Sequence, residues 1–355
     1  MNIVTDPIDQ LISRYGNHNR INLNVANLGV LHTEISDVVN QFERKINGSG
    51  FISYRVRDLI LEMNPFNEID SPSYNLIPFY SSTLTLNIVI FGITQNLKRK
   101  PVVLIQEGEH IGVSSPSRAF GEVIEYDENF SEDLDKFKQK VSKCDVIIFS
   151  KNRYYDGKKE NSSLIYKIAK ETNEKIFVIC DLAQTYGLEP IPFGDFDIGY
   201  TSSHKWICGP GGFGLFWIKK NLMNIVKLGG DKFGDLSRVG GDDFIGYLSQ
   251  ALSHKMFFSN LEEIKEKYKF YNSLALNIFK KNKLLKYIHS DHPGYTILST
   301  RNLNDAYRTY ENILKDGCDI KFIADRHLFR ITPMWHHSKD KVAEGFEKID
   351  MISKK

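Results

Sequence analysis

Between residues 75 and 220, short apolar runs alternate with segments whose apolar residues recur every three or four positions. The apolar runs are NLIPFY (75–80), VVLIQ (102–106), DVIIFS (145–150), KIFVIC (175–180), FDIGYTSS (196–203) and FGLFWI (213–218). Helical spacing is clearest in residues 131–141 and 161–172. Strands that are apolar throughout and separated by helices are typical of a mostly parallel sheet covered on both faces. This pattern predicts an α/β fold.

The pattern changes after about residue 245. Residues 247–285 are rich in lysine and glutamate and have helical spacing. Further helices are predicted at 303–315 and 338–352, and further strands at 295–300, 318–324 and 327–332. We therefore expect a large α/β domain over 21–245 and a small C-terminal α+β domain over 246–355. A helix near 8–20 lies in an N-terminal segment, 1–20, that can pack with either domain.

The composition is that of an ordinary globular protein. The 355 residues are 41% hydrophobic and 25% charged, with a formal net charge of +2, which argues against a nucleic-acid partner. The longest apolar stretch, 86–93, is too short to cross a membrane, and the N-terminus lacks a secretory signal pattern. The cysteines have no disulfide-framework or zinc spacing, so we expect no metal and a cytoplasmic location: Cys144, Cys180, Cys208 and Cys318.

Polar residues follow four of the predicted strands. In open parallel sheets ligands bind beyond the carboxyl ends of the strands, so these residues are the first candidates for a site. They are Ser82 and Thr83, His110, Asp181 and Gln184, and Ser202, His204 and Lys205. Each also has an ordinary structural explanation, since serine, threonine and aspartate often cap helices and histidine is common in loops.

Taken together, the candidates match the groups that one particular cofactor needs. A desolvated lysine such as Lys205 can form a Schiff base. Hydroxyl groups, an imidazole and a helix N-terminus suit a phosphate. Pyridoxal 5'-phosphate requires a lysine, a carboxylate for its pyridine nitrogen, a phosphate cradle and a flat group over its ring. The sequence thus indicates a pyridoxal-phosphate site.

The order Ser82-Thr83, His110, Asp181-x-x-Gln184 and Ser202-x-His204-Lys205 resembles the fold-type I pyridoxal-phosphate enzymes. More specifically, the chain is similar to the class V aminotransferase and cysteine desulfurase family over about residues 20–340. The resemblance implies a large domain with a mostly parallel sheet and a smaller C-terminal α+β domain.

The resemblance also implies a role for each matching residue. Lys205 would hold the cofactor covalently, and Asp181 would pair with the pyridinium nitrogen. Gln184 would bind the ring oxygen, and His110 would stack on the ring. The phosphate would be held by four residues: Ser82, Thr83, Ser202 and His204.

A further match lies in HLFRITPMWHHS (327–338), which resembles the family strand whose arginine binds the substrate carboxylate. Arg330 would be that arginine, because a planar guanidinium suits bidentate carboxylate recognition. The family's homodimer is expected as well. However, residues 239–242 read Val-Gly-Gly-Asp where the family's partner loop usually has Gly-Thr.

The family resemblance leaves several reactions open. The lead hypothesis is an enzyme that binds an α-amino acid as an external aldimine and removes its Cα proton. The outcome is β-elimination of the C–S lyase type or transamination, as in amino-acid metabolism. The alternatives are a cysteine desulfurase, an epimerase, a kynureninase-like hydrolase and a cofactor-binding protein without turnover. A desulfurase role for Cys318 lacks the expected flanking residues, and a dehydrogenase is disfavoured because the glycines of GPGGFG follow Lys205 rather than a first strand.

Overall fold

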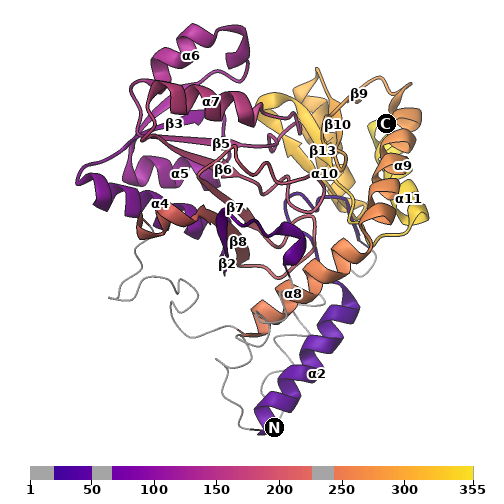
Figure 1. Ribbon diagram of the computed structural model, residues 1–355. Coiled ribbons are helices and arrows are strands. Elements are labelled where there is room, and N and C mark those ends of the chain that lie inside the picture. The colour runs from indigo at the N-terminus through magenta and orange to yellow at the C-terminus, as the bar shows by residue number, and fades with distance from the viewer. Residues whose placement is uncertain (1–19, 50–65, 226–243, 355) are drawn as a thin grey trace. The chain divides into compact units, whose positions relative to one another are not determined.

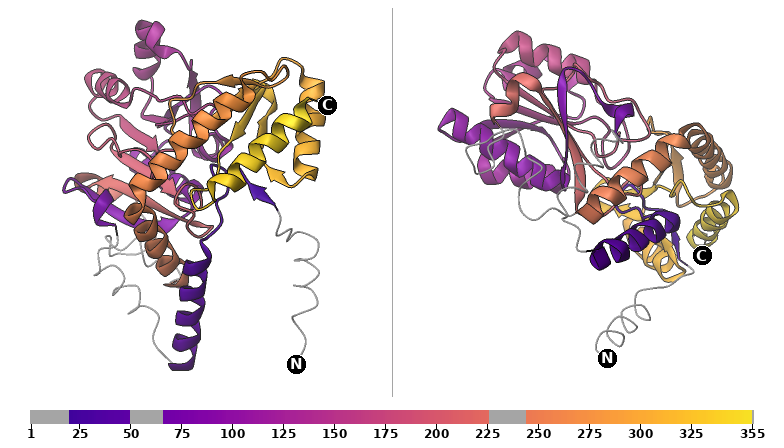
Figure 2. Two further views of the ribbon diagram at one scale, coloured as in Figure 1. Left: turned by 90° about the vertical axis from the view of Figure 1, so that its right-hand side faces the viewer. Right: turned by 60° about the horizontal axis from the view of Figure 1, so that its bottom comes forward.

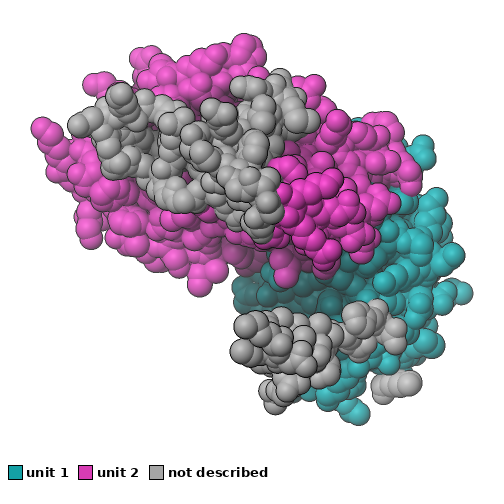
Figure 3. Space-filling model, turned by 90° about the horizontal axis from the view of Figure 1, so that it is seen from below, with its two compact units in different colours: residues 1–27, 265–355 teal, residues 28–264 magenta. Residues whose placement is uncertain are grey.

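The computed structural model describes residues 20–49, 66–225 and 244–354 (Figure 1). The chain forms two compact units, which are residues 28–264 and residues 1–27 together with 265–355 (Figure 3). The helix expected at 8–20 and the segment 239–242 lie outside the described residues. Each unit has its own sheet, and the two are described separately below.

The 28–264 unit is built on a seven-stranded sheet with the order β2-β8-β7-β6-β5-β3-β4. Its strands are β2 (Tyr74–Tyr80), β3 (Val102–Gln106), β4 (Glu122–Tyr126), β5 (Val146–Ser150), β6 (Phe177–Asp181), β7 (Ile198–Ser202) and β8 (Phe213–Lys219). Only β8 runs against its neighbours β2 and β7, so the other six strands are parallel to one another. All six predicted apolar runs form strands of this sheet, and the prediction of a mostly parallel sheet is confirmed.

Helices cover both faces of this sheet, with α4 and α5 on one face and α6 and α7 on the other (Figure 1). The helices of the unit are α2 (Thr33–Ser49), α4 (Ser82–Leu97), α5 (Ile111–Phe120), α6 (Leu134–Val141), α7 (Ser162–Thr172) and α8 (Phe244–Ser259). Short 3-10 turns add Asn67–Ile69, Phe130–Glu132 and Lys220–Ile225. None of the helices in the described part of the chain is long and apolar enough to cross a membrane.

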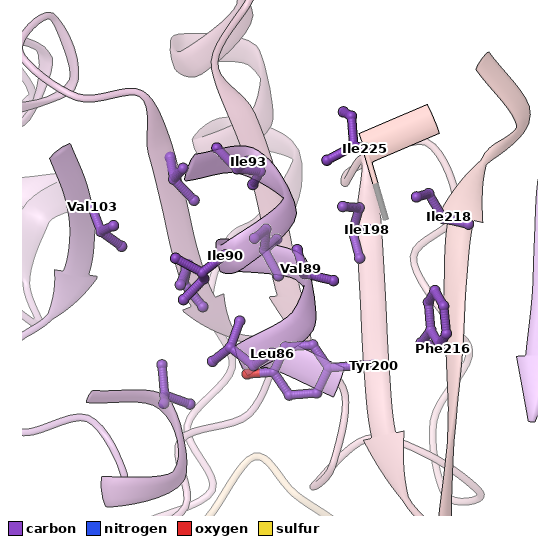
Figure 4. Close-up of a cluster of buried hydrophobic side chains, with 14 of the residues drawn as sticks. Leu86, Val89, Ile90, Ile93, Val103, Ile198, Tyr200, Phe216, Ile218 and Ile225 are labelled. Atoms are coloured by element: carbon purple, nitrogen blue, oxygen red, sulfur yellow. The ribbon is translucent and has the colours of Figure 1, made fainter. Parts of the chain in front are cut away.

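The start of α4 is fixed by its cap and by the core beneath it. Ser81 caps the helix, since its side chain accepts a hydrogen bond from the Leu84 amide at 3.3 Å. Further along α4, four buried apolar residues pack against strands β7 and β8 (Figure 4). They are Leu86, Val89, Ile90 and Ile93, and they meet Ile198, Tyr200, Phe216 and Ile218. Burying each such side chain is worth about 1.5–3 kcal/mol, so the first turn of α4 is held firmly beside β7.

The second unit holds a four-stranded antiparallel sheet with the order β12-β13-β10-β9. Its strands are β9 (Lys286–Ile288), β10 (Thr296–Ser299), β12 (Lys321–Ile323) and β13 (Leu328–Ile331). Its helices are α9 (Leu261–Phe279, which begins in the first unit), α10 (Leu303–Lys315) and α11 (Lys339–Ser353), with a 3-10 turn at Ala324–Arg326. Helices α9 and α11 lie side by side (Figure 2), where the rings of Phe279 and Phe346 are 6.1 Å apart.

The prediction of one strand over 318–324 is wrong, because this segment forms two strands in different sheets. The first, β11 (Cys318–Asp319), pairs in parallel with β1 (Ile21–Asn22). The second, β12, pairs with β13 instead. The change of partner takes place at the buried residue Ile320, which lies between the two strands and belongs to neither.

Candidate active site

The carboxyl ends of the parallel strands bring most of the predicted site residues to one edge of the large sheet. Strand β2 ends at Tyr80, two residues before Ser82 and three before Thr83, and β3 ends four residues before His110. Asp181 is the last residue of β6 and Ser202 is the last residue of β7. Because β6 and β7 are neighbouring parallel strands, Asp181 and the turn that contains Lys205 lie side by side.

Lys205 lies in a tight turn directly after β7. The Ser203 amide donates to the Phe213 carbonyl at 2.9 Å, and the Cys208 amide donates to the Lys205 carbonyl at 2.9 Å. A third hydrogen bond, from the Gly209 amide to the Ser203 carbonyl at 2.9 Å, completes the turn. The main chain around the half-buried lysine is therefore held in one conformation. A reactive amine needs such a fixed position if it is to meet a ligand in a defined geometry.

A distant segment holds the same turn from the other side. The Gly29 amide donates to the His204 carbonyl at 2.5 Å. A Cβ atom on Gly29 would lie 2.7 Å from the Lys205 carbonyl oxygen and 2.9 Å from the Cys208 sulfur. Only glycine therefore fits at position 29 without moving the lysine turn. The sequence did not single out Gly29, because nothing in the residues near it signals a contact with a turn so far along the chain.

Glycine is also required where the turn leads into β8. A Cβ atom on Gly214 would lie 2.2 Å from the Thr201 carbonyl oxygen, which is the main chain of the neighbouring strand β7. A Cβ atom on Gly209 would lie 3.0 Å from the side chain and main chain of Ser203. Gly209 and Gly214 therefore allow the main chain after Lys205 to pass close to the lysine turn and to strand β7.

Asp181 supplies an anion close to the lysine. Its Oδ1 accepts a hydrogen bond from the Ala183 amide at 2.7 Å, which fixes the carboxylate at the strand end. Burial raises the pKa of Asp181 above its ordinary value, whereas the nearby Lys205 cation and the Ala183 amide lower that pKa. Tyr200 stands opposite Asp181 in the β6–β7 pair, and is almost completely buried. Asp181 is therefore a partly desolvated carboxylate beside a cation. A carboxylate in such surroundings is suited to hold a positively charged group of a ligand.

Two polar atoms next to Lys205 are buried and make no hydrogen bond with the residues that the structure describes. They are the Ser202 hydroxyl and the Nδ1 atom of His204. Burial, followed by the Lys205 charge, lowers the pKa of His204 to about 4, so its imidazole is neutral at pH 7. Buried polar atoms almost always have a hydrogen-bond partner, so an orphaned pair beside a lysine indicates the place of a bound polar group.

The first turns of α4 and α5 lie against each other at the same edge. A Cβ atom on Gly112 would lie 3.1 Å from both the Thr83 hydroxyl oxygen and the His110 Nδ1 atom. His110 caps α5, and its Nδ1 accepts a hydrogen bond from the Gly112 amide at 3.0 Å. Its exposed ring meets the edge of Tyr154, with 5.2 Å between the ring centroids. The histidine therefore has a defined orientation before any ligand is present.

Gln184 and Arg330 are both buried, in different units. The Gln184 Oε1 atom accepts a hydrogen bond from the Trp206 indole at 3.2 Å, which ties it to the residue after Lys205. Arg330 lies in β13 of the second unit, with its guanidinium 5.5 Å from the centroid of the Tyr295 ring and 3.4 Å from the Asn24 side-chain oxygen. The structure thus places all the predicted site residues of the first unit at one edge of its large sheet, and shows Arg330 in its own surroundings.

Comparison with known proteins agrees with this geometry. Residues 67–240 match the family model described as aminotransferase class V. A "Probable cysteine desulfurase" of Mycoplasma genitalium is 24% identical over 168 residues, which make up 44% of this chain and 41% of that protein. The chain is therefore aligned with less than half of the length of this curated relative.

Solved structures with the same fold cover nearly the whole chain. A NifS-like protein from Rickettsia africae has a TM-score of 0.76 at 14% identity, over 93% of this chain and 99% of that chain. The protein C-DES, with glycine covalently linked to its pyridoxal-phosphate cofactor, has a TM-score of 0.81 at 14% identity, over 94% and 97% of the two chains. A second structure describes C-DES as a cystine C–S lyase in complex with its product cysteine persulfide, with a TM-score of 0.75 at 13% identity and coverage of 94% and 98%.

Residues 67–240 are therefore similar to the class V aminotransferase family, and the chain shares its fold with C-DES, whose structure carries a pyridoxal-phosphate cofactor. The predicted fold class is confirmed, and the match over residues 67–240 supports the predicted family and cofactor. The residues of this chain also fit the cofactor, because the orphaned Ser202 hydroxyl and His204 imidazole lie next to the Lys205 and Asp181 pair. The roles of the individual residues stay predictions, which the experiments below test.

Proposed function

We propose that this chain is a pyridoxal-phosphate-dependent C–S lyase that acts on a sulfur-containing α-amino acid such as cystine. Removal of the Cα proton and cleavage of the Cβ–S bond release the sulfur fragment, and hydrolysis of the remainder gives pyruvate and ammonia. The family, the type I fold and a C–S lyase among the similar structures support this choice. One observation carries the choice of reaction, and it concerns the cysteines.

All four cysteines of the chain are buried, with at most 5% of their surface exposed. Burial raises the pKa of Cys144 to about 12 and that of Cys318 to about 11, and it also raises the pKa of Cys180 well above its ordinary value. A desulfurase needs an accessible thiolate to accept sulfur, and none of these four thiols is accessible. A lyase that releases its sulfur product to solvent needs no such group.

Each site residue has a distinct task in this proposal. Lys205 would hold the cofactor through its amine, and the same amine would be placed to remove the proton from the substrate Cα. Asp181 holds positive charge at the pyridine nitrogen, and Gln184 and His110 orient the ring. The phosphate is held by Ser82, Thr83, Ser202 and His204, and the substrate carboxylate by Arg330. When bound, pyridoxal phosphate withdraws electrons from the substrate Cα, which makes that proton acidic.

The proposed reaction predicts which products accumulate and which thiol is dispensable. With cystine, the cofactor-loaded enzyme is expected to release pyruvate and ammonia in equal amounts, and Cys318→Ala is expected to retain activity within about twofold, because a buried thiol of raised pKa takes no part. The measurement is a coupled assay of pyruvate, ammonia, sulfide and alanine, with thermal melting to check that the variant is folded. With cysteine and a reducing thiol in place of cystine, alanine and sulfide without pyruvate, together with an inactive but folded Cys318→Ala, would show a desulfurase instead. A 2-oxo acid formed without free ammonia would show transamination.

Arg330 is predicted to bind the substrate rather than the cofactor. Loss of a charge-assisted bidentate contact in Arg330→Ala is expected to raise KM for the amino acid by roughly tenfold to a hundredfold, with the absorption of the bound cofactor unchanged. Arg301→Ala, at an exposed position just after β10, is the matched control and should leave KM unchanged. Loss of the cofactor absorption in Arg330→Ala would instead show that this arginine supports the fold of its unit.

A homodimer and a cytoplasmic location are part of the same proposal. Leu84 and Ile111, in the first turns of α4 and α5, are 43% and 71% exposed although they are large apolar residues. Leu28 and Val30, on either side of Gly29, are 54% and 52% exposed. Large apolar side chains that stay exposed favour contact with a second copy of the chain. Four cysteines without a disulfide fit a reducing compartment.

A further inference from the structure

Glu109 is a carboxylic acid at the edge of the site to which the reaction described above gives no task. It lies in the turn between β3 and α5, immediately before His110. Its Oε1 atom accepts a hydrogen bond from the His110 amide at 2.8 Å, and its Oε2 atom accepts one from the Ser150 hydroxyl at 2.8 Å. Ser150 ends β5 and pairs directly with Asp181 in β6. Glu109 is therefore connected across neighbouring strands to the predicted partner of the pyridine nitrogen.

The surroundings of Glu109 are mainly acidic or phenolic. Asp181 and Glu160 both raise the pKa of Glu109, and Glu109 in turn raises the pKa of Tyr126 and Tyr200. Burial is the largest cause, and together these effects raise the pKa of Glu109 to about 7, although the His110 amide and Ser150 oppose the rise. An ordinary glutamate is ionised well below neutral pH, whereas Glu109 gains or loses its proton in the range where an enzyme works.

We propose that Glu109 is a positioning residue of the cofactor site, which holds the main chain of His110 in place and sets the negative charge beside Asp181. This inference rests on the function proposed above. Glu109 holds the main chain of His110, and the Gly112 amide holds the imidazole of His110. The imidazole is therefore held in one orientation in which it can stack on the cofactor ring. Ionisation of Glu109 adds a negative charge near Asp181, and this strengthens the hold on a proton at the neighbouring cofactor nitrogen.

Two variants separate the two tasks of this residue. Glu109→Gln keeps an oxygen that can accept from the His110 amide but removes the titrating charge. Glu109→Ala removes both. The matched control is Glu107→Gln, because Glu107 is exposed in the same turn. Each protein is titrated with pyridoxal 5'-phosphate to measure its affinity for the cofactor. The absorption of the bound cofactor is then followed from about pH 6 to about pH 8.5, a range that includes the raised pKa of Glu109.

We expect Glu109→Gln to move the midpoint of the absorption change to lower pH by about half to one unit, since a charge that favours the protonated site is lost. Its affinity for the cofactor should stay within about twofold of the wild type. Glu109→Ala should show the same shift and bind the cofactor about tenfold more weakly, because the His110 amide loses its acceptor. The Glu107→Gln control should match the wild type in both measurements.

The outcomes distinguish failure of this inference from failure of the proposed function. If the wild type binds the cofactor and both Glu109 variants behave like Glu107→Gln, the role of Glu109 is overturned and the proposed function stands. If the wild type shows no cofactor absorption, both are overturned. Should Glu109→Ala fail to fold, the pH midpoint of Glu109→Gln still decides, because a purely structural residue would leave that midpoint unchanged.

Discussion

Lys205→Ala is expected to lower turnover by at least about 10³-fold and to abolish the absorption of covalently bound cofactor. Proton transfer by a positioned group contributes roughly 10²–10⁴-fold on its own, and this lysine is also the only candidate for the covalent bond in the 202–214 turn. Because the turn is held by main-chain hydrogen bonds and by Gly29, removing the side chain should leave the fold intact. The measurement combines steady-state assays with the absorption spectrum of the cofactor-loaded protein.

Two controls make the Lys205 result specific. Lys205→Arg keeps a cation beside Asp181 but has no amine that can react at neutral pH, so it should fold as well as the wild type and remain inactive. Lys220→Ala, at an exposed position just after β8, should retain full activity and the full spectrum. A Lys205→Ala protein that keeps the covalent absorption and its turnover would contradict the account.

Asp181→Asn is expected to lower kcat by roughly 10²–10³-fold, the usual cost of losing one preorganised electrostatic partner. The substitution keeps the shape of the side chain and an oxygen for the Ala183 amide, but it removes the negative charge. The exposed Asp135, in the first turn of α6, provides the matched control Asp135→Asn, which should be fully active. Both proteins are compared by kcat and by cofactor affinity.

Stability should separate a functional role of Asp181 from a structural one. The pKa of Asp181 is raised by burial, so the folded state holds a proton more tightly than the unfolded state does. Above its ordinary pKa the ionised carboxylate therefore costs folding free energy, and the cost grows as the pH rises toward the pKa of the folded state. Without cofactor, Asp181→Asn should be at least as thermostable at pH 7 as the wild type. A large loss of stability would show that the aspartate is there for the fold.

Much of the large sheet could be predicted because its strands are apolar along their whole length. Strand β5 is an example, since every residue of Val146–Ser150 is buried between two layers of helices. Strand β4 was not predicted, because Glu122–Tyr126 contains two glutamates and lies at the end of the strand order, where one side has no neighbour. The split of residues 318–324 could not be predicted either, because it depends on which strand each half meets.

The candidate site shows the same division between local and distant information. Asp181 and Lys205 could be placed together from the sequence because they follow successive strands that are neighbours in a parallel sheet. The contact of Gly29 with the lysine turn could not, since it joins segments far apart in the chain with no common motif. The link from Glu109 through Ser150 to Asp181 was also missed, because it depends on strand order and register rather than on spacing.

The central claim is that Lys205 carries the cofactor, and chemical mapping tests it most directly. The protein is loaded with pyridoxal 5'-phosphate, reduced with borohydride to make the bond to lysine permanent, digested and analysed by mass spectrometry. We predict that the modified lysine is Lys205, in the peptide that contains SSHKWICGPGGFG (202–214). Modification of a different lysine, or of none, would contradict it.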